Sequence, residues 1–406
     1  IYIYMNLAIN GGKPVRSSPL QYGFQTIDES DKQAVLDVLN ENKYLTTGPK
    51  VIEFQDKVKE YCGVKYACAV NSGTAALHVA VNALDLKVTD EVIVTCLSFV
   101  ASSNSIVYCG VKPVFCDIEE DTMNIDPDKI EELINENTKA IIVVDFAGQS
   151  CDYHKIMPIV KKYKLALIED AAHSIGTQIN SCPSRPKVGS FADITTFSFH
   201  PVKNITTCEG GMVVTNNEKY YNRMKVFLTH GITRDYKERE KSSDSASHYY
   251  EMVELGYNYR IPDILCALGI NQLKKLDNFI KKRQEIAKIY DKKLEKFNKY
   301  LIPLKQKWES AYHIYVIKLN LDNLKTNRDT IFKALKEEGI GVNVHYMPIH
   351  LHPFYKNNFG TYEGMMPIAE KVYKQIITLP IFPLISDKDI DDVVISIDKV
   401  LNFYKK

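Results

Sequence analysis

One lysine stands in a segment whose layout suits covalent chemistry. Residues 195–199 are rich in apolar and β-branched side chains and predict a strand, Pro201 ends it, and a polar loop then holds Lys203. The loop closes on Glu209-Gly210-Gly211 before another apolar run at 212–215. An amine presented between two buried strands is suited to forming a Schiff base with a carbonyl group. Taken alone, a lysine is far more often a solvated surface residue, so its surroundings must decide the interpretation.

Three other features suit the binding of a phosphorylated, aromatic cofactor. In 71–74 (Asn-Ser-Gly-Thr), a glycine and hydroxyl groups stand where a predicted strand turns into a helix, and helix N-termini attract phosphate. Asp170 ends an apolar run, and a buried carboxylate needs a cationic partner such as the pyridinium nitrogen of pyridoxal phosphate. Phe99 follows a strand and could stack on a ring. Each feature alone is more often an ordinary N-cap, a turn aspartate or a core phenylalanine.

These motifs follow one order along the chain: the Gly73 turn, Phe99, Asp170 with His173, then Ser-Phe-His-Pro-Val-Lys at 198–203 before Glu-Gly-Gly. This order resembles the nucleotide-sugar aminotransferases of the DegT/StrS type, pyridoxal-phosphate enzymes with the aspartate-aminotransferase fold. The resemblance extends from about residue 7 to the end of the chain. Further matching segments are 230–235, 255–260 and 345–350.

The resemblance implies catalytic roles for three residues. Lys203 would bond covalently to the cofactor and shuttle protons, and Asp170 would pair with the pyridinium nitrogen. His173 would lie near the ring or its 3-hydroxyl, with Phe99 stacked on the ring face. Some relatives that dehydrate their substrate have histidine at the lysine position, so lysine favours transamination here.

The resemblance also implies a phosphate site shared between subunits. Gly73, Thr74 and Ser198 would bind the phosphate from one subunit, and Asn258 would reach it from the other. The expected assembly is therefore a homodimer with shared active sites. Cys208 departs from the small residue, often glycine, that the family has just before Glu-Gly-Gly, and it places a thiol close to the cofactor loop.

Segment 345–350 is similar to relatives that aminate C4 of a 4-keto-6-deoxyhexose, including a viosamine-forming member from a giant virus. We therefore expect L-glutamate to donate its amino group to a UDP- or dTDP-linked sugar. His345 and Tyr346 would contact this substrate, and Arg234 and Arg260 would hold a carboxylate or pyrophosphate. Structural roles are as typical of such residues as substrate contact: a local hydrogen bond for His345 and His350, and an ordinary ion pair for the two arginines. Alternatives are a C3 aminotransferase, a dehydratase-like relative and a catalytically silent regulator or scaffold.

Composition excludes several other classes. The 406 residues have a net charge of +1 with both signs interspersed, which argues against nucleic acid or an acidic membrane as partner. No apolar run approaches the roughly 18 residues of a membrane span, and a signal peptide is not expected. Nine cysteines without a CxxC pair indicate reduced thiols and no metal site. We expect a cytoplasmic enzyme, in the host cytoplasm if the source is a virus.

Short apolar runs alternate with helical patterns between residues 66 and 215, which predicts an α/β fold of type I with a mainly parallel sheet. Such a sheet binds its ligand at the carboxyl ends of its strands. The expected strands are 66–70, 91–96, 112–117, 140–145, 165–169, 192–199 and 212–215. The expected helices are 28–39, 51–61, 74–84, 101–108, 128–135 and 153–163.

Two domains follow an N-terminal segment, 1–27, that would wrap over a neighbour. The large cofactor-binding domain is expected over 28–275 and a smaller α/β domain over 276–406. Residues 261–290 would form one long connecting helix, and the charged, serine-rich 237–248 a mobile surface loop. The small domain would contain strands 312–319 and 342–345 and helices 328–338, 369–374 and 387–404.

Overall fold

The computed structural model describes residues 6–182, 184–235 and 248–406. At its centre is a seven-stranded sheet in the order β1-β7-β6-β5-β4-β2-β3. Strands β3, β2, β4, β5 and β6 pair in parallel, whereas β7 runs antiparallel to both of its neighbours, β6 and β1. The predicted α/β fold with a mainly parallel sheet is confirmed. The strands are Tyr66–Val70 (β1), Glu91–Thr95 (β2), Lys112–Cys116 (β3), Thr138–Val144 (β4), Ala166–Asp170 (β5), Ile194–Ser198 (β6) and Gly211–Thr215 (β7).

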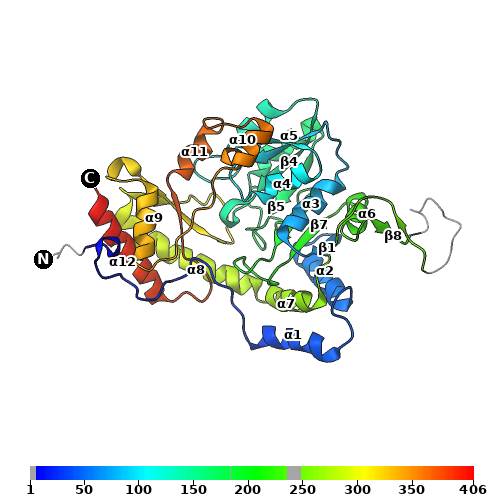
Figure 1. Cartoon of the computed structure of the whole chain (residues 1–406), viewed down its shortest axis with the longest axis horizontal. Helices are drawn as coiled ribbons and strands as arrows, with labels where there is room; N and C mark the ends of the chain where they lie inside the picture. Colours follow the sequence, from blue (N-terminus) through cyan, green and yellow to red (C-terminus); the bar gives the residue numbers. More distant parts are fainter. Residues whose placement is uncertain (1–5, 183, 236–247) are drawn as a thin grey trace.

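Helices cover both faces of this sheet (Figure 1). Successive strand residues point to opposite faces, so Val92 and Val94 belong to one apolar cluster and Ile93 to the other. One face is covered by α3 (Gly73–Ala83), α4 (Ala101–Tyr108) and α6 (Glu218–Phe227). The other face is covered by α2 (Pro49–Cys62), α5 (Tyr153–Tyr163) and α7 (Asp263–Leu273). The almost wholly apolar strands are explained by this double burial.

A second, antiparallel sheet of three strands lies toward the C-terminus, in the order β10-β11-β12. Its core also contains Leu7 and Leu20, so the N-terminal segment packs on this sheet. The prediction of a strand at 342–345 is wrong. Within this segment Asn343 alone forms a β-bridge, to Thr378, and the third strand of the sheet is instead the apolar run just before Pro380. The elements are β10 (Leu301–Pro303), β11 (Tyr315–Leu319), β12 (Ile376–Leu379), α9 (Arg328–Glu337), α10 (Pro353–Phe359), α11 (Pro367–Tyr373) and α12 (Asp387–Tyr404).

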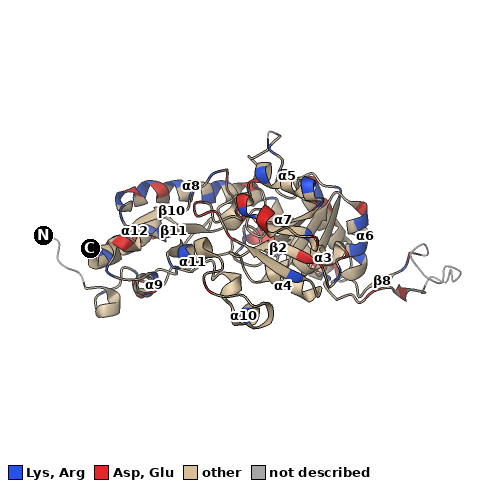
Figure 2. Ribbon diagram, turned by 90° about the horizontal axis from the view of Figure 1, so that it is seen from above, with Lys and Arg blue, Asp and Glu red and all other residues tan. Residues whose placement is uncertain are grey.

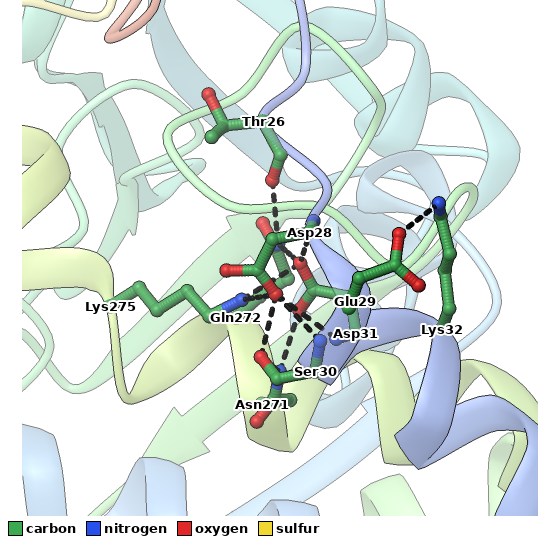
Figure 3. Close-up of polar contacts among 9 residues, drawn as sticks. All are labelled: Thr26, Asp28, Glu29, Ser30, Asp31, Lys32, Asn271, Gln272 and Lys275. Atoms are coloured by element: carbon green, nitrogen blue, oxygen red, sulfur yellow. Dashed lines mark hydrogen bonds and ion pairs between the residues drawn. The ribbon is translucent and has the colours of Figure 1, made fainter.

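The expected single helix over 261–290 is also wrong, because α7 ends at Leu273 and α8 (Leu276–Leu294) begins after a turn. Figure 3 shows the polar contacts at this turn. Lys275 Nζ lies 2.8 Å from Oδ2 of the buried Asp31, which also accepts a hydrogen bond from Gln272. Gln272 in turn donates to the Thr26 carbonyl. The turn is therefore where α1 (Glu29–Glu41) and the N-terminal segment contact the end of α7 and the start of α8.

The third correction concerns the expected helix at 128–135. The segment forms two 3₁₀ turns, Pro127–Lys129 and Glu131–Leu133. Asp126 caps the first turn by accepting from the Asp128 backbone N–H, and Ile134 is already extended. The segment therefore forms 3₁₀ turns, which are rarely longer than three or four residues, in place of the expected α-helix.

A short hairpin of β8 (Ile232–Thr233) and β9 (Glu251–Met252) projects from the body of the molecule (Figure 1). Of the loop expected at 237–248, only His248 belongs to the described residues. Figure 2 shows acidic and basic residues interspersed over the helices. Among the described residues, no helix is long and apolar enough to cross a membrane.

Candidate active site

Four of the predicted site residues follow strands that end at one edge of the large sheet. Strands β1 and β6 are both antiparallel to β7, so they run in the same direction as each other and as β2 and β5. Gly73 follows β1, Phe99 follows β2, Asp170 ends β5 and Lys203 follows β6. The topology thus brings together segments that are far apart in the sequence.

Lys203 and Asp170 form the charged centre of this edge. Removal from water lowers the pKa of Lys203 to about 8, and the Asp170 carboxylate opposes that shift. Burial raises the pKa of Asp170, while Ser102, the Ala172 backbone N–H and Lys203 lower it. Ser102 Oγ donates to Asp170 Oδ2 at 2.7 Å, and Ala172 N donates to Oδ1 at 3.2 Å. The site therefore has an amine that is partly neutral near physiological pH beside a carboxylate that gains from a cationic partner.

The turn after β1 lies against the end of β6. A Cβ atom added at Gly73 would lie 2.7 Å from Ser198 Cβ, so only glycine allows this close approach. Ser72 caps α3, with its Oγ accepting from the Ala75 backbone N–H. The backbone N–H groups of Gly73 and Thr74 belong to the first helical turn and have no intrahelical acceptor. These N–H groups and the Ser198 hydroxyl together form a cradle suited to phosphate.

Histidine and tyrosine side chains form the other side of the site. His173 Nε2 lies 3.1 Å from Tyr346 Oη, and the His313 ring centroid is 4.3 Å from that of His173. Burial, reinforced by Lys203, lowers the pKa of His345 to about 3, and its Nδ1 lies 2.8 Å from Thr378 Oγ1. Burial likewise lowers the pKa values of His173 and His313, so these imidazoles are neutral near pH 7.

Phe99 is exposed at the mouth of the site. Its side chain is 56% exposed, and its ring centroid lies 6.2 Å from that of Tyr346. A large apolar side chain that projects beside Tyr346 instead of packing in the core is available to contact a ring. The alternative interpretation, in which Phe99 is an ordinary core residue, is therefore wrong.

The segment predicted to serve a partner subunit lies beside the phosphate turn of its own chain. Asn71 N donates to the Tyr259 carbonyl at 2.9 Å, and Asn71 Nδ2 donates to the Asn258 carbonyl at 3.3 Å. Asn258 is exposed and Arg260 is half-buried. Arg234 lies elsewhere, directly after β8 on the loop side of the projecting hairpin, with its guanidinium 5.3 Å from the Tyr250 ring centroid.

The second carboxylate at the end of β5 belongs to a separate network. Glu169 is fully buried and accepts from Tyr153 Oη at 2.6 Å, Thr195 Oγ1 at 2.7 Å and Gly189 N at 3.1 Å. Alternation along the strand places it on the face opposite to Asp170. His350 is likewise structural, because its Nε2 lies 2.8 Å from Glu370 Oε1 in a buried pair.

Ser102 and His313 were not predicted from the sequence. Ser102 lies in the first turn of α4, just after the strand-end segment that contains Phe99, and this position next to the carboxyl end of β2 was the available signal. His313 precedes β11 in the distant C-terminal half, and only the packing of the two sheets reveals its place beside His173.

Cys208 has a backbone φ of 65°, in the left-handed region. This conformation explains the family preference for glycine there, since a side chain costs roughly 1–3 kcal/mol in strain. The Cys208 N–H donates to Thr206 Oγ1 at 2.9 Å, which helps to hold the turn. The thiol is exposed.

The residues present fit pyridoxal phosphate. The group requires a reactive amine, a carboxylate for its ring nitrogen, and N–H and hydroxyl donors for its phosphate. Lys203, Asp170 and the corner between Gly73 and Ser198 supply these three requirements at one edge of the sheet.

Comparison with known proteins gives the same result. Residues 25–398 match the DegT/DnrJ/EryC1/StrS aminotransferase family. The UDP-4-amino-4,6-dideoxy-N-acetyl-beta-L-altrosamine transaminase of Campylobacter jejuni is 42% identical over 95% of this chain and 99% of its own. Helicobacter pylori PseC, an aminotransferase involved in the biosynthesis of pseudoaminic acid, superposes with a TM-score of 0.88 at 35% identity, covering 95% and 100% of the two chains. The PLP form of Streptococcus pneumoniae Spr1654, a putative sugar aminotransferase, superposes with a TM-score of 0.85 at 30% sequence identity. The match covers 95% of this chain and 99% of that one.

The expected family, type I fold, enzyme class and cofactor are confirmed by these matches. The chain belongs to the DegT/DnrJ/EryC1/StrS aminotransferase family, whose members act on nucleotide sugars with pyridoxal phosphate as cofactor.

Proposed function

We propose that the chain transfers the amino group of L-glutamate to C4 of a nucleotide-linked 4-keto-6-deoxyhexose, giving a 4-amino-4,6-dideoxyhexose and 2-oxoglutarate. The observation that carries this proposal is the amine of Lys203, with a pKa of about 8, beside the buried Asp170. C4 is supported by the Campylobacter relative, whose name specifies a 4-amino-4,6-dideoxy sugar.

Each predicted residue has a role in this proposal. When bound, pyridoxal phosphate stabilises negative charge on the substrate carbon. Lys203 holds the cofactor between turnovers and, once released, its neutral amine moves the proton between the substrate and cofactor carbons. Asp170 keeps the ring nitrogen protonated. His173, whose Nε2 pairs with Tyr346 Oη, would lie near the ring, and Phe99, beside the same tyrosine, would contact the ring face.

Gly73, Thr74 and Ser198 bind the phosphate in this proposal, and Asn258 reaches the phosphate of a partner subunit. Large apolar residues exposed on the N-terminal helices and around the β8–β9 hairpin support a homodimer, because such surface is normally covered. They include Leu36 (48% exposed), Leu45 (51%), Ile52 (60%), Met252 (65%) and Leu255 (75%).

The sugar is proposed to contact the side of the site formed by His345 and Tyr346. Arg260 lies next to the turn after β1, whereas Arg234 lies in the hairpin that projects from the body of the molecule, so we propose that Arg234 serves the partner's site. UDP is favoured over dTDP, and an N-acetylated sugar over a viosamine precursor, because the Campylobacter relative acts on a UDP-linked, N-acetylated sugar.

The test is incubation of the holoenzyme with L-glutamate and one of three substrates. These are UDP-linked N-acetylated 4-keto-6-deoxyhexose, UDP-4-keto-6-deoxyglucose and dTDP-4-keto-6-deoxyglucose. NMR of the product should show the amine on C4, with the highest kcat/KM for the N-acetylated sugar. Amination at C3, or no amination of any of the three, would contradict the proposal.

Shared sites are tested by mixing two inactive variants, Lys203→Ala and Asn258→Ala. A mixed dimer would contain one site with both Lys203 and Asn258 intact, so activity should return on subunit exchange. Exchange that is verified by a tag but restores no activity would show that each chain forms its site alone.

A further inference from the structure

A small cavity lies directly behind the Lys203 loop. Its volume is about 10 Å³, and Lys203 and Asn204 of the loop, Thr26 of the N-terminal segment, Gln272 of α7 and Arg283 of α8 contribute to its lining. The cavity is therefore the place where the loop, both helices and the N-terminal segment meet. Figure 3 shows Thr26 and Gln272 joined by a hydrogen bond at this junction.

Three polar atoms of the lining residues are buried and, within the described part of the chain, have no hydrogen-bond partner. They are Thr26 Oγ1, Asn204 Oδ1 and Arg283 Nε. Asn204 is 5% exposed and Arg283 is 1% exposed, so bulk water does not satisfy them. A buried polar atom left unpaired is costly, and such atoms normally have a protein or water partner.

The remaining polar groups of two of these residues fix their orientation. Arg283 Nη1 donates to the carbonyls of Tyr312 at 3.2 Å, and of His313 and Ile381 at 3.1 Å each. Asn204 Nδ2 donates to the Ala311 carbonyl at 3.2 Å. Neither side chain can rotate to find another partner without breaking these hydrogen bonds. The hydrogen-bond partner of Asn204 Oδ1 and of Arg283 Nε must therefore be a molecule bound in the cavity.

We propose that the cavity binds one ordered water molecule that accepts from Arg283 Nε–H and donates to Asn204 Oδ1 and Thr26 Oγ1. The chemistry matches, because water offers two donors and can accept, and a buried water typically makes about three hydrogen bonds. The volume matches as well, since about 10–15 Å³ holds one water. The three named residues provide no carboxylate for a cation.

The water would connect the Lys203 loop to the rest of the protein, since Asn204 is the next residue after Lys203. Thr26, Asn204 and Arg283 are thus positioning residues that act on Lys203 through the water. Arg283 also holds the backbone of His313, whose ring contacts His173. This consequence for catalysis rests on the proposed function, whereas the water site itself does not.

A crystal structure of the holoenzyme at about 1.5 Å resolution or better tests the site directly. A water peak is expected within about 2.7–3.2 Å of all three atoms. Two findings would overturn the proposal: a dry cavity, or direct hydrogen bonds among the three side chains. A crystal soaked in bromide tests for an anion, and an anomalous peak in the cavity would also overturn the assignment to water.

The matched variants are Thr26→Val, which removes the hydroxyl at nearly constant volume, and Thr26→Ser, which retains it. Their single-turnover rates with L-glutamate, followed by cofactor absorbance, do not depend on which sugar is the substrate. We expect the rate to fall about fivefold in Thr26→Val, as for one lost hydrogen bond, and to be restored in Thr26→Ser. Equal rates in both variants would overturn the positioning role. A wild type that does not respond to glutamate would instead contradict the proposed function.

Discussion

Two adjacent carboxylates on β5 lie in polar surroundings of opposite kinds. Glu169 is enclosed by donors from its own chain, namely Tyr153, Thr195 and Gly189. Asp170, on the other face, accepts one hydroxyl and one backbone N–H and lies beside Lys203. The comparison shows how a polar group that stabilises the fold differs from one that is available to a ligand.

The difference extends beyond the two carboxylates. Around Asp170, the N–H groups of Gly73 and Thr74 lack intrahelical acceptors, and His173 Nδ1 is buried without a hydrogen-bond partner among the described residues. Glu169, in contrast, accepts hydrogen bonds from three donors of its own chain. A site that remains incomplete on its own is the expected form of a binding site, because the ligand completes its hydrogen bonds.

The largest effect is expected from Lys203→Ala. Loss of both the covalent link and the proton-transfer group should reduce multiple turnover by at least about 10⁴-fold. Tm should change little, because burial already disfavours the charged form of this lysine and the described residues offer it no ion pair. Turnover within tenfold of wild type would show that the reactive amine lies elsewhere.

The next effect separates the two carboxylates. Asp170→Asn should reduce kcat by roughly 10–100-fold, as for a lost charge-assisted hydrogen bond, at nearly unchanged Tm. Glu169→Gln should leave kcat nearly unchanged and lower the free energy of unfolding by about 1–3 kcal/mol. The NH₂ group of the glutamine would face the hydroxyl and N–H donors that now bind the carboxylate, so donors would be left without an acceptor. Steady-state kinetics and thermal unfolding check both variants, and the reverse pattern would refute the comparison.

The pH dependence of cofactor capture gives a third test. The neutral amine is the nucleophile, and burial lowers the pKa of Lys203 to about 8, so the neutral fraction rises through that pH. The rate at which apoenzyme binds pyridoxal phosphate should therefore increase with pH and reach half its plateau near pH 8. An unperturbed lysine would continue to gain rate up to a pKa of about 10.4. Stopped-flow absorbance distinguishes the two profiles.

The smallest effect is expected from Ser102→Ala. The variant removes the 2.7 Å hydrogen bond to Asp170 Oδ2 and should raise the pKa of that carboxyl further. One lost hydrogen bond should weaken cofactor affinity by about fivefold. Ser105→Ala is a matched control on the same helix, since among the described residues Ser105 Oγ donates to the Ser102 carbonyl and to no carboxylate. Equal affinities for the two variants would exclude Ser102 from supporting Asp170.

The sequence predicted those parts of the site that follow strands of the large sheet. Asp170 and Lys203 lie next to apolar runs, and parallel strands bring their carboxyl ends to one edge regardless of distant packing. His313 could not be found in this way, because its place beside His173 depends on how the two sheets pack.

The errors in the fold have a similar cause. The pattern of 261–290 is helical throughout, and only the contact of Lys275 with Asp31 and Asp28 shows why the chain turns there. Residues 342–345 alternate apolar and polar side chains as a strand would, but Ile376–Leu379 provides the strand that pairs with β11. Tertiary contacts determined these elements, so local patterns were insufficient.

Reduction of the holoenzyme with borohydride, followed by peptide mass spectrometry, tests the central claim most directly. Reduction would fix the bond between the cofactor and its lysine, so the adduct should appear on the peptide that contains Lys203, with the other lysines unmodified. An adduct on a different lysine, or no adduct on an enzyme that aminates its sugar, would contradict the account.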